Sequence, residues 1–225
     1  MPDFKRIGLL GGTFNPIHLG HLRAVRKVGE KFGLNQIYLI PSAIPPHKSP
    51  EGIADAEYRL EMTRMAVSDC TDIIVSDVEL KRSGPSYTID TVRHFRSVLT
   101  RDAELYFIIG LDAFLEIDLW KSYKELFLLI PFIVMIRPGY SRKSDALREL
   151  DVFLRSGISD GYGYSASRDC YVHAEKQAVY IAEADFLDIS STEIRRRIKD
   201  GGSIRSLVPE KIENFIKTKG LFHEI

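Results

Sequence analysis

The chain has 225 residues, and its 31 Lys and Arg side chains balance 31 Asp and Glu side chains to a formal net charge of zero. With 44% hydrophobic and 28% charged residues, the composition is that of a folded protein and excludes the disordered, collagen-like and coiled-coil classes. Because no net positive charge is present, we expect neither a nucleic acid nor an anionic membrane as a partner.

The chain contains two cysteines, Cys70 and Cys170, which stand far apart and outside any metal-binding spacing. This pattern favours a reducing compartment and argues against a thiol-ligated zinc site or a disulfide framework. The first apolar run is interrupted by glycines and is too short for a signal peptide, and no later run reaches the length of a membrane span. We therefore expect a cytoplasmic protein. A homo-oligomer stays open, because nothing in the sequence decides it.

Short β-rich apolar runs alternate along the chain with stretches of helical periodicity. The predicted strands are residues 7–10, 37–40, 73–75, 105–109, 132–136 and 179–181. The predicted helices between them are residues 19–32, 56–68, 88–99, 112–128 and 144–154. This alternation predicts an α/β fold in which a doubly wound, Rossmann-like parallel sheet is covered by helices on both faces.

Two more helices are expected near the C-terminal end. The first spans residues 191–199, and the second is opened by Pro209 and closed by Gly220, which are the usual residues at those positions. We expect them to form a small helical subdomain, residues 190–225, within one domain that spans residues 1–225.

Residues 156–168 are rich in Gly, Ser and Tyr and lack periodicity, which predicts an exposed loop rather than a domain boundary. The residues that directly follow each predicted strand are the first candidates for a ligand-binding site. Ligands of open parallel sheets bind beyond the carboxyl ends of the strands.

The first predicted strand leads into Gly11, Gly12, Thr13 and Phe14, and a helix begins shortly afterwards. Glycines let backbone N–H groups approach an anion closely, and the N-terminal end of a helix carries a positive partial charge. The glycines alone are weak evidence for a phosphate site, because such a pair is more often only a tight turn.

His18 and His21 are spaced i, i+3, which predicts that they share a face of the first helical turn. Helical side chains lean toward the N-terminus, so both imidazoles should face the glycine loop and offer donors to a phosphoryl group. Gly20 between them is costly inside a helix, which indicates that another group comes close there. A metal site is the rival interpretation, but we predict none, because no third ligand stands at a suitable spacing.

This stretch resembles the (H/T)xGH signature of the nucleotidyltransferase superfamily, and it matches neither the GxxxxGK[ST] loop nor the GxGxxG fingerprint. Further blocks narrow the resemblance to bacterial nicotinate-nucleotide adenylyltransferases and follow in that family's order over nearly the whole chain. They are residues 40–48 (IPSAIPPHK), 85–91 (PSYTIDT), 109–112 (IGLD), Trp120, 137–139 (RPG), 189–195 (ISSTEIR) and 207–209 (LVP).

The resemblance implies transfer of the adenylyl group of ATP to nicotinate mononucleotide, with Mg²⁺ bound mainly through the ATP phosphates. It implies catalytic roles for His18, His21 and Arg195. The residues that it places at ATP are Gly11, Gly12, Thr13, Phe14, His18, His21, Asp112, Ser190, Ser191, Thr192 and Arg195. Those that it places at nicotinate mononucleotide are Asn15, Lys48, Tyr87, Thr88 and Trp120.

Ordinary structural interpretations stand beside these roles. Ser190 and Glu193 match an S-x-x-E capping box, Asp112 matches a helix N-cap, and a lone Trp120 is usually a core residue. Asn15 replaces an aspartate common among relatives, and Lys121 and Ser122 follow Trp120 where relatives often carry another aromatic residue or an arginine. The details of the base pocket therefore stay open.

Three alternatives remain. A sister adenylyltransferase would use nicotinamide mononucleotide or phosphopantetheine as acceptor. A cytidylyltransferase would carry an RTxGxST block where this chain has ISSTEIR. A non-catalytic nucleotide sensor would be expected to have lost a histidine or the serines of that block. Because residues 85–88 contain no Asp or Glu, we expect a pocket of donors that prefers the nicotinate carboxylate to the amide.

Overall fold

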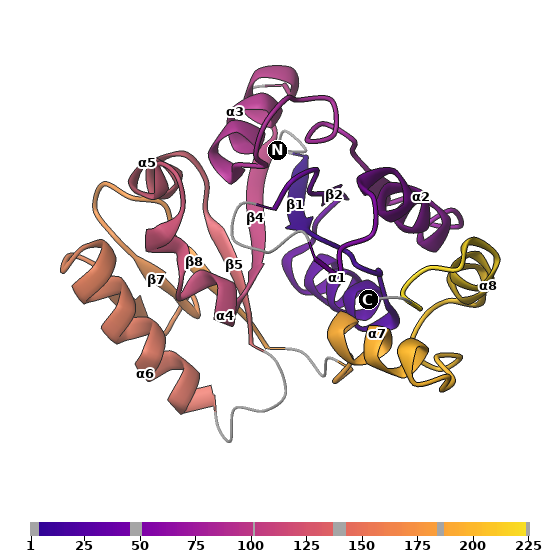
Figure 1. Cartoon of the computed structure of the whole chain (residues 1–225). Helices are drawn as coiled ribbons and strands as arrows, with labels where there is room; N and C mark the ends of the chain where they lie inside the picture. Colours follow the sequence, from indigo (N-terminus) through magenta and orange to yellow (C-terminus); the bar gives the residue numbers. More distant parts are fainter. Residues whose placement is uncertain (1–4, 46–50, 101, 137–142, 184–186, 224–225) are drawn as a thin grey trace.

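The computed structural model describes residues 5–45, 51–100, 102–136, 143–183 and 187–223. Within them, eight strands form one sheet in the order β3-β2-β1-β4-β5-β8-β7-β6. Figure 1 shows the central strands of this sheet with helices around them. The strands are β1 (Arg6–Gly12), β2 (Gln36–Pro41), β3 (Ile73–Val75), β4 (Glu104–Gly110), β5 (Phe132–Ile136), β6 (Gly163–Ser165), β7 (Cys170–Val172) and β8 (Val179–Glu183). The part of the sheet from β3 to β8 is parallel, as predicted.

Helices cover both faces of the sheet, which confirms the doubly wound α/β prediction. They are α1 (Leu19–Phe32), α2 (Ala56–Ala66), α3 (Thr88–Val98), α4 (Leu111–Phe114), η1 (Ile117–Leu119), α5 (Tyr123–Leu129), α6 (Lys143–Phe153), η2 (Leu154–Ile158), α7 (Ser191–Lys199) and α8 (Glu210–Lys219). Of these, η1 is a 3₁₀-helix and η2 a π-helix. No helix among the described residues is long and apolar enough to cross a membrane.

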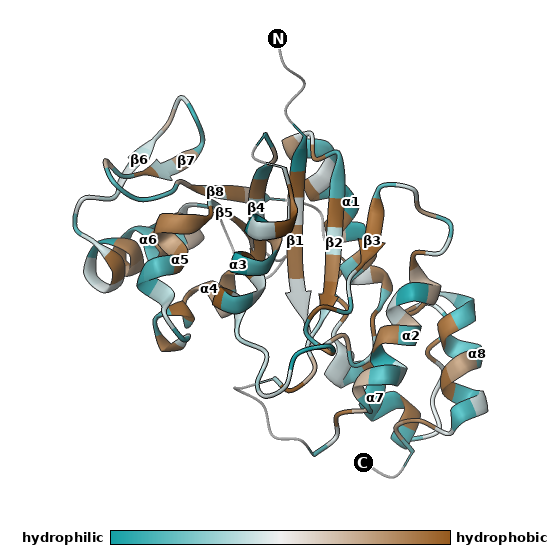
Figure 2. Cartoon of the chain, turned by 90° about the horizontal axis from the view of Figure 1, so that it is seen from above, coloured by the Kyte–Doolittle hydropathy of each residue, from teal (hydrophilic) through white to brown (hydrophobic). Residues whose placement is uncertain are grey.

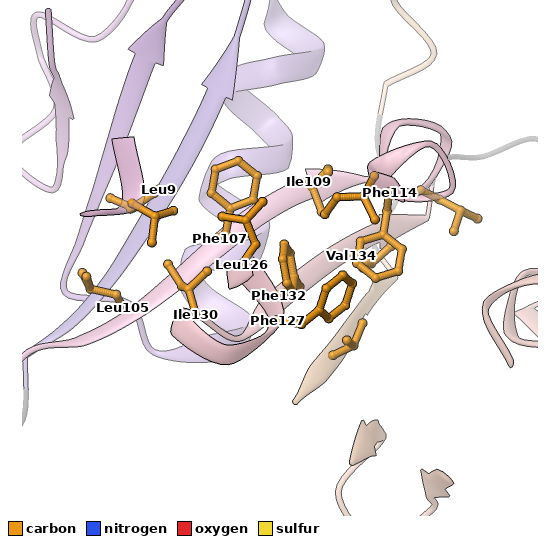
Figure 3. Close-up of a cluster of buried hydrophobic side chains, with 14 of the residues drawn as sticks. Leu9, Leu105, Phe107, Ile109, Phe114, Leu126, Phe127, Ile130, Phe132 and Val134 are labelled. Carbon is orange, nitrogen blue, oxygen red and sulfur yellow. The ribbon is translucent and has the colours of Figure 1, made fainter. Parts of the chain in front are cut away.

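Two hydrophobic clusters lie on opposite faces of the sheet. Neighbouring residues of a strand point to opposite faces, so Leu9 joins the cluster under α3 to α6, and Leu10 joins the cluster under α1, α2, α7 and α8. Figure 3 shows the first cluster, where Phe107, Phe127 and Phe132 pack together. Figure 2 shows the apolar strands between helices that carry both polar and apolar residues. Complete burial of one Val, Leu, Ile or Phe side chain in these clusters stabilises the fold by about 1.5–3 kcal/mol.

The predicted single helix over residues 112–128 is wrong, because the chain forms α4, η1 and α5 instead. Trp120 has extended backbone angles, and Ser122 has a left-handed φ of 54°, so the helix is interrupted twice. Phe114 and Phe127 are both fully buried. In one straight helix, thirteen residues apart, they would point roughly 140° away from each other.

The predicted exposed loop over residues 156–168 is also wrong in part. Tyr162 is only 1% exposed and donates a hydrogen bond to the Gln177 carbonyl. The next residues form β6, which pairs antiparallel with β7, and β7 pairs antiparallel with β8. The sheet is therefore mixed at this edge. Strands of three residues leave little periodicity in a sequence, and their stability comes from pairing with distant partners.

Candidate active site

A cleft of about 600 Å³ opens at the carboxyl ends of β1 and β4. The connections reverse direction between these two strands, which is the switch point where ligands of open α/β sheets bind. Of the predicted site residues, Lys48 lies outside the described residues. The cleft is lined by all the others: Gly11, Gly12, Thr13, Phe14, Asn15, His18, His21, Tyr87, Thr88, Asp112, Trp120, Ser190, Ser191, Thr192 and Arg195.

The glycine loop is held in shape by its own packing. Gly11 and Gly12 end β1, and the Gly12 carbonyl accepts a hydrogen bond from the Ser42 N–H at 2.9 Å. A Cβ atom on Gly12 would lie 2.9 Å from the buried ring of Phe14, whose own φ is 48°. Glycine is therefore required at position 12 because the loop folds back over it.

His18 and His21 cap the same helix end reciprocally. His18 is the N-cap of α1, and its Nδ1 accepts from the His21 backbone N–H at 3.3 Å, while His21 Nδ1 accepts from the His18 N–H at 3.3 Å. The two rings are stacked with their centres 3.6 Å apart. The histidines do share a face, as predicted, but His18 precedes the first turn instead of lying in it.

This reciprocal cap fixes the chemistry of both imidazoles. A backbone N–H is always a donor, so each Nδ1 atom must act as an acceptor and carries no proton. In the neutral ring the proton then resides on Nε2. Both histidines line the cleft, and both are prepared as Nε2–H donors, which is what an anionic group requires.

Gly20 allows this arrangement. A Cβ atom at position 20 would lie 2.9 Å from His18 Nδ1 and 3.2 Å from the Leu187 carbonyl oxygen. The prediction that another group comes close to Gly20 is therefore confirmed, and that group includes the capping histidine itself.

The block 190–195 lies against the glycine loop. The Ser190 Oγ accepts from the Glu193 N–H at 3.1 Å and caps α7. Ser191 Oγ donates to the Pro16 carbonyl at 2.9 Å. Arg195 Nη1 donates to the Asn15 carbonyl at 2.8 Å. These bonds place the hydroxyls and free N–H groups at the start of α7 beside the histidines.

Only half of the predicted capping box forms. The Glu193 carboxylate is engaged by Arg196 and Arg197, whose hydrogen bonds lower the pKa of Glu193 to about 2. Arg196 and Arg197 are thereby occupied on the solvent side of α7, whereas Arg195 faces the cleft. Burial lowers the pKa of the Arg195 guanidinium, which nonetheless remains charged at neutral pH.

The opposite wall of the cleft contains Tyr87, Thr88 and Trp120. Ser86 ties this wall to the loop after β2, because Ser86 N–H donates to the Ile44 carbonyl and Ser86 Oγ accepts from the Ala43 N–H, both at 2.9 Å. Trp120 is partly buried, with its ring edge-on to Phe107 at 6.3 Å, so it belongs to the core and to the cleft wall together.

Asn15 lines the cleft, but its amide group is held by the backbone. Its Nδ2 donates to the Gly52 carbonyl at 2.7 Å, and its Oδ1 accepts from the Ala54 N–H at 3.0 Å. Asp112 is exposed in the first turn of α4, whose N-cap is Gly110, so the N-cap interpretation of Asp112 is wrong. Binding roles for Asn15 and Asp112 stay predictions.

Glu79 is a buried carboxylate in the cleft wall that the sequence did not reveal. It is 6% exposed, and its Oε1 accepts from Thr91 Oγ1 at 2.6 Å, with Arg82 at 3.7 Å. Burial raises the pKa of Glu79, although hydrogen bonds from Thr91 and Ser86 oppose the shift. Glu79 stands outside residues 85–88, so the expectation of a pocket without carboxylates holds for that segment and not for the whole wall.

Arg59 is the second functional candidate that sequence reasoning missed. It is 1% exposed, and its guanidinium donates to four backbone carbonyls, those of Thr13, Ser42, Ala43 and Ala54, at 2.7–3.0 Å. One cation thus joins the loops that follow β1 and β2. A helical arginine carries no signal of this in the sequence, because its partners are main-chain atoms.

The described residues form neither a serine activated by His173 nor a metal-binding cluster. Ser159 Oγ lies 2.9 Å from His173 Nε2, but His173 Nδ1 accepts from the N–H groups of Glu175 and Lys176. His173 Nε2 is therefore protonated and cannot take a proton from Ser159. The described residues contain no group of three His, Cys, Asp or Glu side chains that could hold a metal ion.

Comparisons with known proteins identify the family of this chain. A family model described as cytidylyltransferase-like matches residues 9–197. A protein of Desulfatibacillum aliphaticivorans, named "Probable nicotinate-nucleotide adenylyltransferase", is 42% identical over 96% of this chain and 99% of its own. A protein of the same name from Geotalea daltonii is 40% identical over 97% and 99%. The chain belongs to the nicotinate-nucleotide adenylyltransferase family.

Solved structures share the fold of this adenylyltransferase family. The Plasmodium falciparum nicotinic acid mononucleotide adenylyltransferase complexed with NaAD superposes with a TM-score of 0.72 at 18% identity, over 97% of both chains. The same enzyme complexed with APC gives a TM-score of 0.70 at 17% identity. The resemblance inferred from the sequence blocks is thus confirmed for the family, while the roles of single residues rest on the geometry above.

Proposed function

We propose that this chain transfers the adenylyl group of ATP to nicotinate mononucleotide, which forms deamido-NAD (nicotinate adenine dinucleotide) and pyrophosphate in NAD biosynthesis. The observation that carries the proposal is the reciprocal cap of His18 and His21, which prepares two Nε2–H donors in a cleft beside the start of α7. Both cysteines are free, so we place the enzyme in the cytoplasm, where ATP is abundant.

In the proposed mechanism, an oxygen of the acceptor's phosphate attacks the α-phosphorus of ATP in line. A bond forms from this oxygen to the α-phosphorus, and the bond from the α-phosphorus to the β-bridging oxygen breaks. Pyrophosphate leaves with that electron pair. The attacking oxygen is already anionic, so no general base is required, and catalysis consists mainly of positioning and charge stabilisation.

The two sides of the triphosphate have different partners in this mechanism. His18 and His21 donate to the oxygens around the α-phosphorus, where charge develops in the transition state. The hydroxyls of Ser190 and Thr192 and the N–H groups at the start of α7, that of Ser191 included, hold the β and γ phosphates together with Arg195 and then hold the leaving pyrophosphate. The dipole of α7 adds a favourable field at its N-terminal end.

In this proposal Mg²⁺ would be bound by the phosphate oxygens of ATP, and its positive charge would offset charge on the leaving pyrophosphate. The exposed carboxylates in the cleft wall, Asp112 and Glu116, are oxygen donors of the kind that Mg²⁺ accepts. The chain's own residues bind and orient the nucleotide around that ion.

The acceptor occupies the wall of Tyr87, Thr88 and Trp120 in this proposal, with its ring on the face of Trp120. A carboxylate accepts hydrogen bonds from every donor of that wall, whereas an amide turns its NH₂ group toward at least one of them. Each such mismatch costs about 1–3 kcal/mol, which corresponds to a preference of about tenfold to a few hundredfold for the acid.

The test is a pyrophosphate-release assay with Mg²⁺, ATP and one acceptor at a time: nicotinate mononucleotide, nicotinamide mononucleotide or phosphopantetheine. We expect the highest kcat/KM with nicotinate mononucleotide. A higher value with either other acceptor would assign the chain to a sister adenylyltransferase. ATP binding without pyrophosphate release from any acceptor would support the nucleotide sensor.

A further inference from the structure

The wall that is proposed to hold the acceptor contains a cation that has no role so far. Lys121 follows Trp120 directly and lines the cleft together with Tyr87 and Thr88. Its ammonium lies 4.4 Å from the centre of the Tyr87 ring and 3.3 Å from Asp90 Oδ2. The side chain thus lies over the Tyr87 ring at the cleft wall.

The charges around this wall make the position of Lys121 informative. The charged residues that line the described part of the cleft, apart from the histidines, are Glu79, Asp112, Glu116, Lys121 and Arg195. Arg195 lies on the other side, hydrogen-bonded to the Asn15 carbonyl. Lys121 is therefore the cation that lines the described part of the acceptor wall, where its charge attracts an anionic acceptor.

Existing contacts leave Lys121 able to bind another anion. An ammonium has three donors, and Asp90 takes one of them. Asp90 also lies 3.5 Å from Arg93, and Arg93 donates two hydrogen bonds to Glu125 at 3.0 and 2.7 Å. The Lys121 side chain is 49% exposed, so it can turn toward the cleft without losing buried packing.

We propose that Lys121 is a specificity-determining residue that pairs with the ring carboxylate of the acceptor and so favours nicotinate over nicotinamide mononucleotide. The inference rests on the proposed function, because it concerns the acceptor named there. The Lys121 ammonium lies 4.4 Å from the centre of the Tyr87 ring in the same wall as Trp120, so an acceptor ring that packs between Tyr87 and Trp120 has this ammonium within reach. The carboxylate gains a charge pair with the ammonium, and the neutral carboxamide does not.

The size of the effect follows from exposure. Half-exposed ion pairs contribute modestly, so removal of the ammonium should reduce the acid-to-amide ratio of kcat/KM by about two- to tenfold. Because solvent reaches the pair, higher salt should also reduce the ratio in the wild type. The donors of residues 86–88 supply the rest of the preference, so the ratio should fall without reaching unity.

The experiment measures kcat/KM for both acceptors at saturating ATP in the wild type and in Lys121→Met, Lys121→Glu and Lys124→Met. Lys124→Met is the matched control, since Lys124 also lies over a tyrosine ring, at 5.9 Å from that of Tyr123, but does not line the cleft. We expect Lys121→Met to lower the value for the acid only, Lys121→Glu to lower it further, and Lys124→Met to change neither acceptor.

Equal losses for both acceptors in Lys121→Met would overturn the inference, because they would assign Lys121 to the acceptor's phosphate or to the shape of the wall. An unchanged ratio, or a salt effect on the ratio that persists in Lys121→Met, would overturn it as well. Each of these results leaves the proposed function standing as long as the wild type turns over nicotinate mononucleotide. A wild type that uses neither acceptor would overturn both proposals.

Discussion

The two ends of the cleft are built in different ways. The triphosphate end consists of two short segments, residues 11–21 and 190–195, whose polar groups cap their own helices or bond directly to each other. The acceptor end, around Tyr87 and Trp120, is assembled from several segments that meet through contacts such as Ala43 to Ser86 and Glu79 to Thr91. Sequence motifs therefore name side chains at both ends, but the contacts that hold Glu79 in the wall of the acceptor end become visible only in the folded chain.

The largest effect is expected at the reciprocal histidine cap. His21→Ala removes a donor that acts on developing charge, so kcat should fall by about 10² to 10³ while the KM for ATP changes little. Steady-state kinetics measure both, with His94→Ala, an exposed histidine outside the cleft, as the control. A loss of activity below about threefold would remove His21 from the mechanism.

A smaller but more diagnostic effect is expected at Gly20. Gly20→Ala places a Cβ atom 2.9 Å from His18 Nδ1, so it should displace the capping ring and lower kcat by about ten- to a hundredfold. Gly29→Ala is the matched control in the same helix, because its Cβ atom would meet only the flexible end of Ile37. If Gly20→Ala is as active as Gly29→Ala, the reciprocal cap does not determine the position of the His18 and His21 donors.

Substitutions at the start of α7 should weaken the binding of ATP and leave the rate of the chemical step unchanged. Arg195→Ala removes a charged donor, and Ser191→Ala removes the hydrogen bond to the Pro16 carbonyl that holds the start of α7 beside the histidines. Each should raise the KM for ATP by about three- to tenfold and leave the KM for the acceptor nearly unchanged. Arg196→Ala is the control, since Arg196 pairs with Glu193 on the exposed side of the helix. An unchanged KM for ATP in Ser191→Ala would mean that residues 190–195 cap α7 and do not bind ATP.

Glu79→Gln tests the acceptor end and should have the smallest effect. Loss of the charge next to Thr91 and Ser86 loosens that wall, so the KM for the acceptor should rise about two- to fivefold and the KM for ATP should not. A rise confined to ATP would contradict the division of the cleft into two ends.

Glu79 also predicts a pH dependence of stability. Its pKa is raised in the folded state, so the folded protein binds the proton more tightly than the unfolded chain. Stability from this group is therefore present at acidic pH and is lost as the pH rises from the ordinary glutamate pKa through the raised one. The Tm of Glu79→Gln minus the Tm of the wild type should therefore become more positive as the pH rises over this range. A constant difference would contradict the burial assigned to Glu79.

The same division explains what could be predicted from the sequence. Gly20 and the two histidines indicated a crowded donor array, because a glycine inside a helix and the i, i+3 spacing are local signals. Arg59 and Glu79 could not be found in this way, since their partners are main-chain carbonyls and hydroxyls from distant segments. The break at Trp120 was missed as well, because residues 112–128 contain no Gly or Pro to mark the extended Trp120 and the left-handed Ser122.

The most direct test of adenylyl transfer follows the oxygen that attacks. Nicotinate mononucleotide with ¹⁸O in its phosphate is incubated with unlabelled ATP and Mg²⁺, and the ¹⁸O content of both products is measured by mass spectrometry. Attack on the α-phosphorus predicts that all of the label stays in deamido-NAD and that the pyrophosphate contains none. Label in the pyrophosphate, or pyrophosphate without the dinucleotide, would contradict the account.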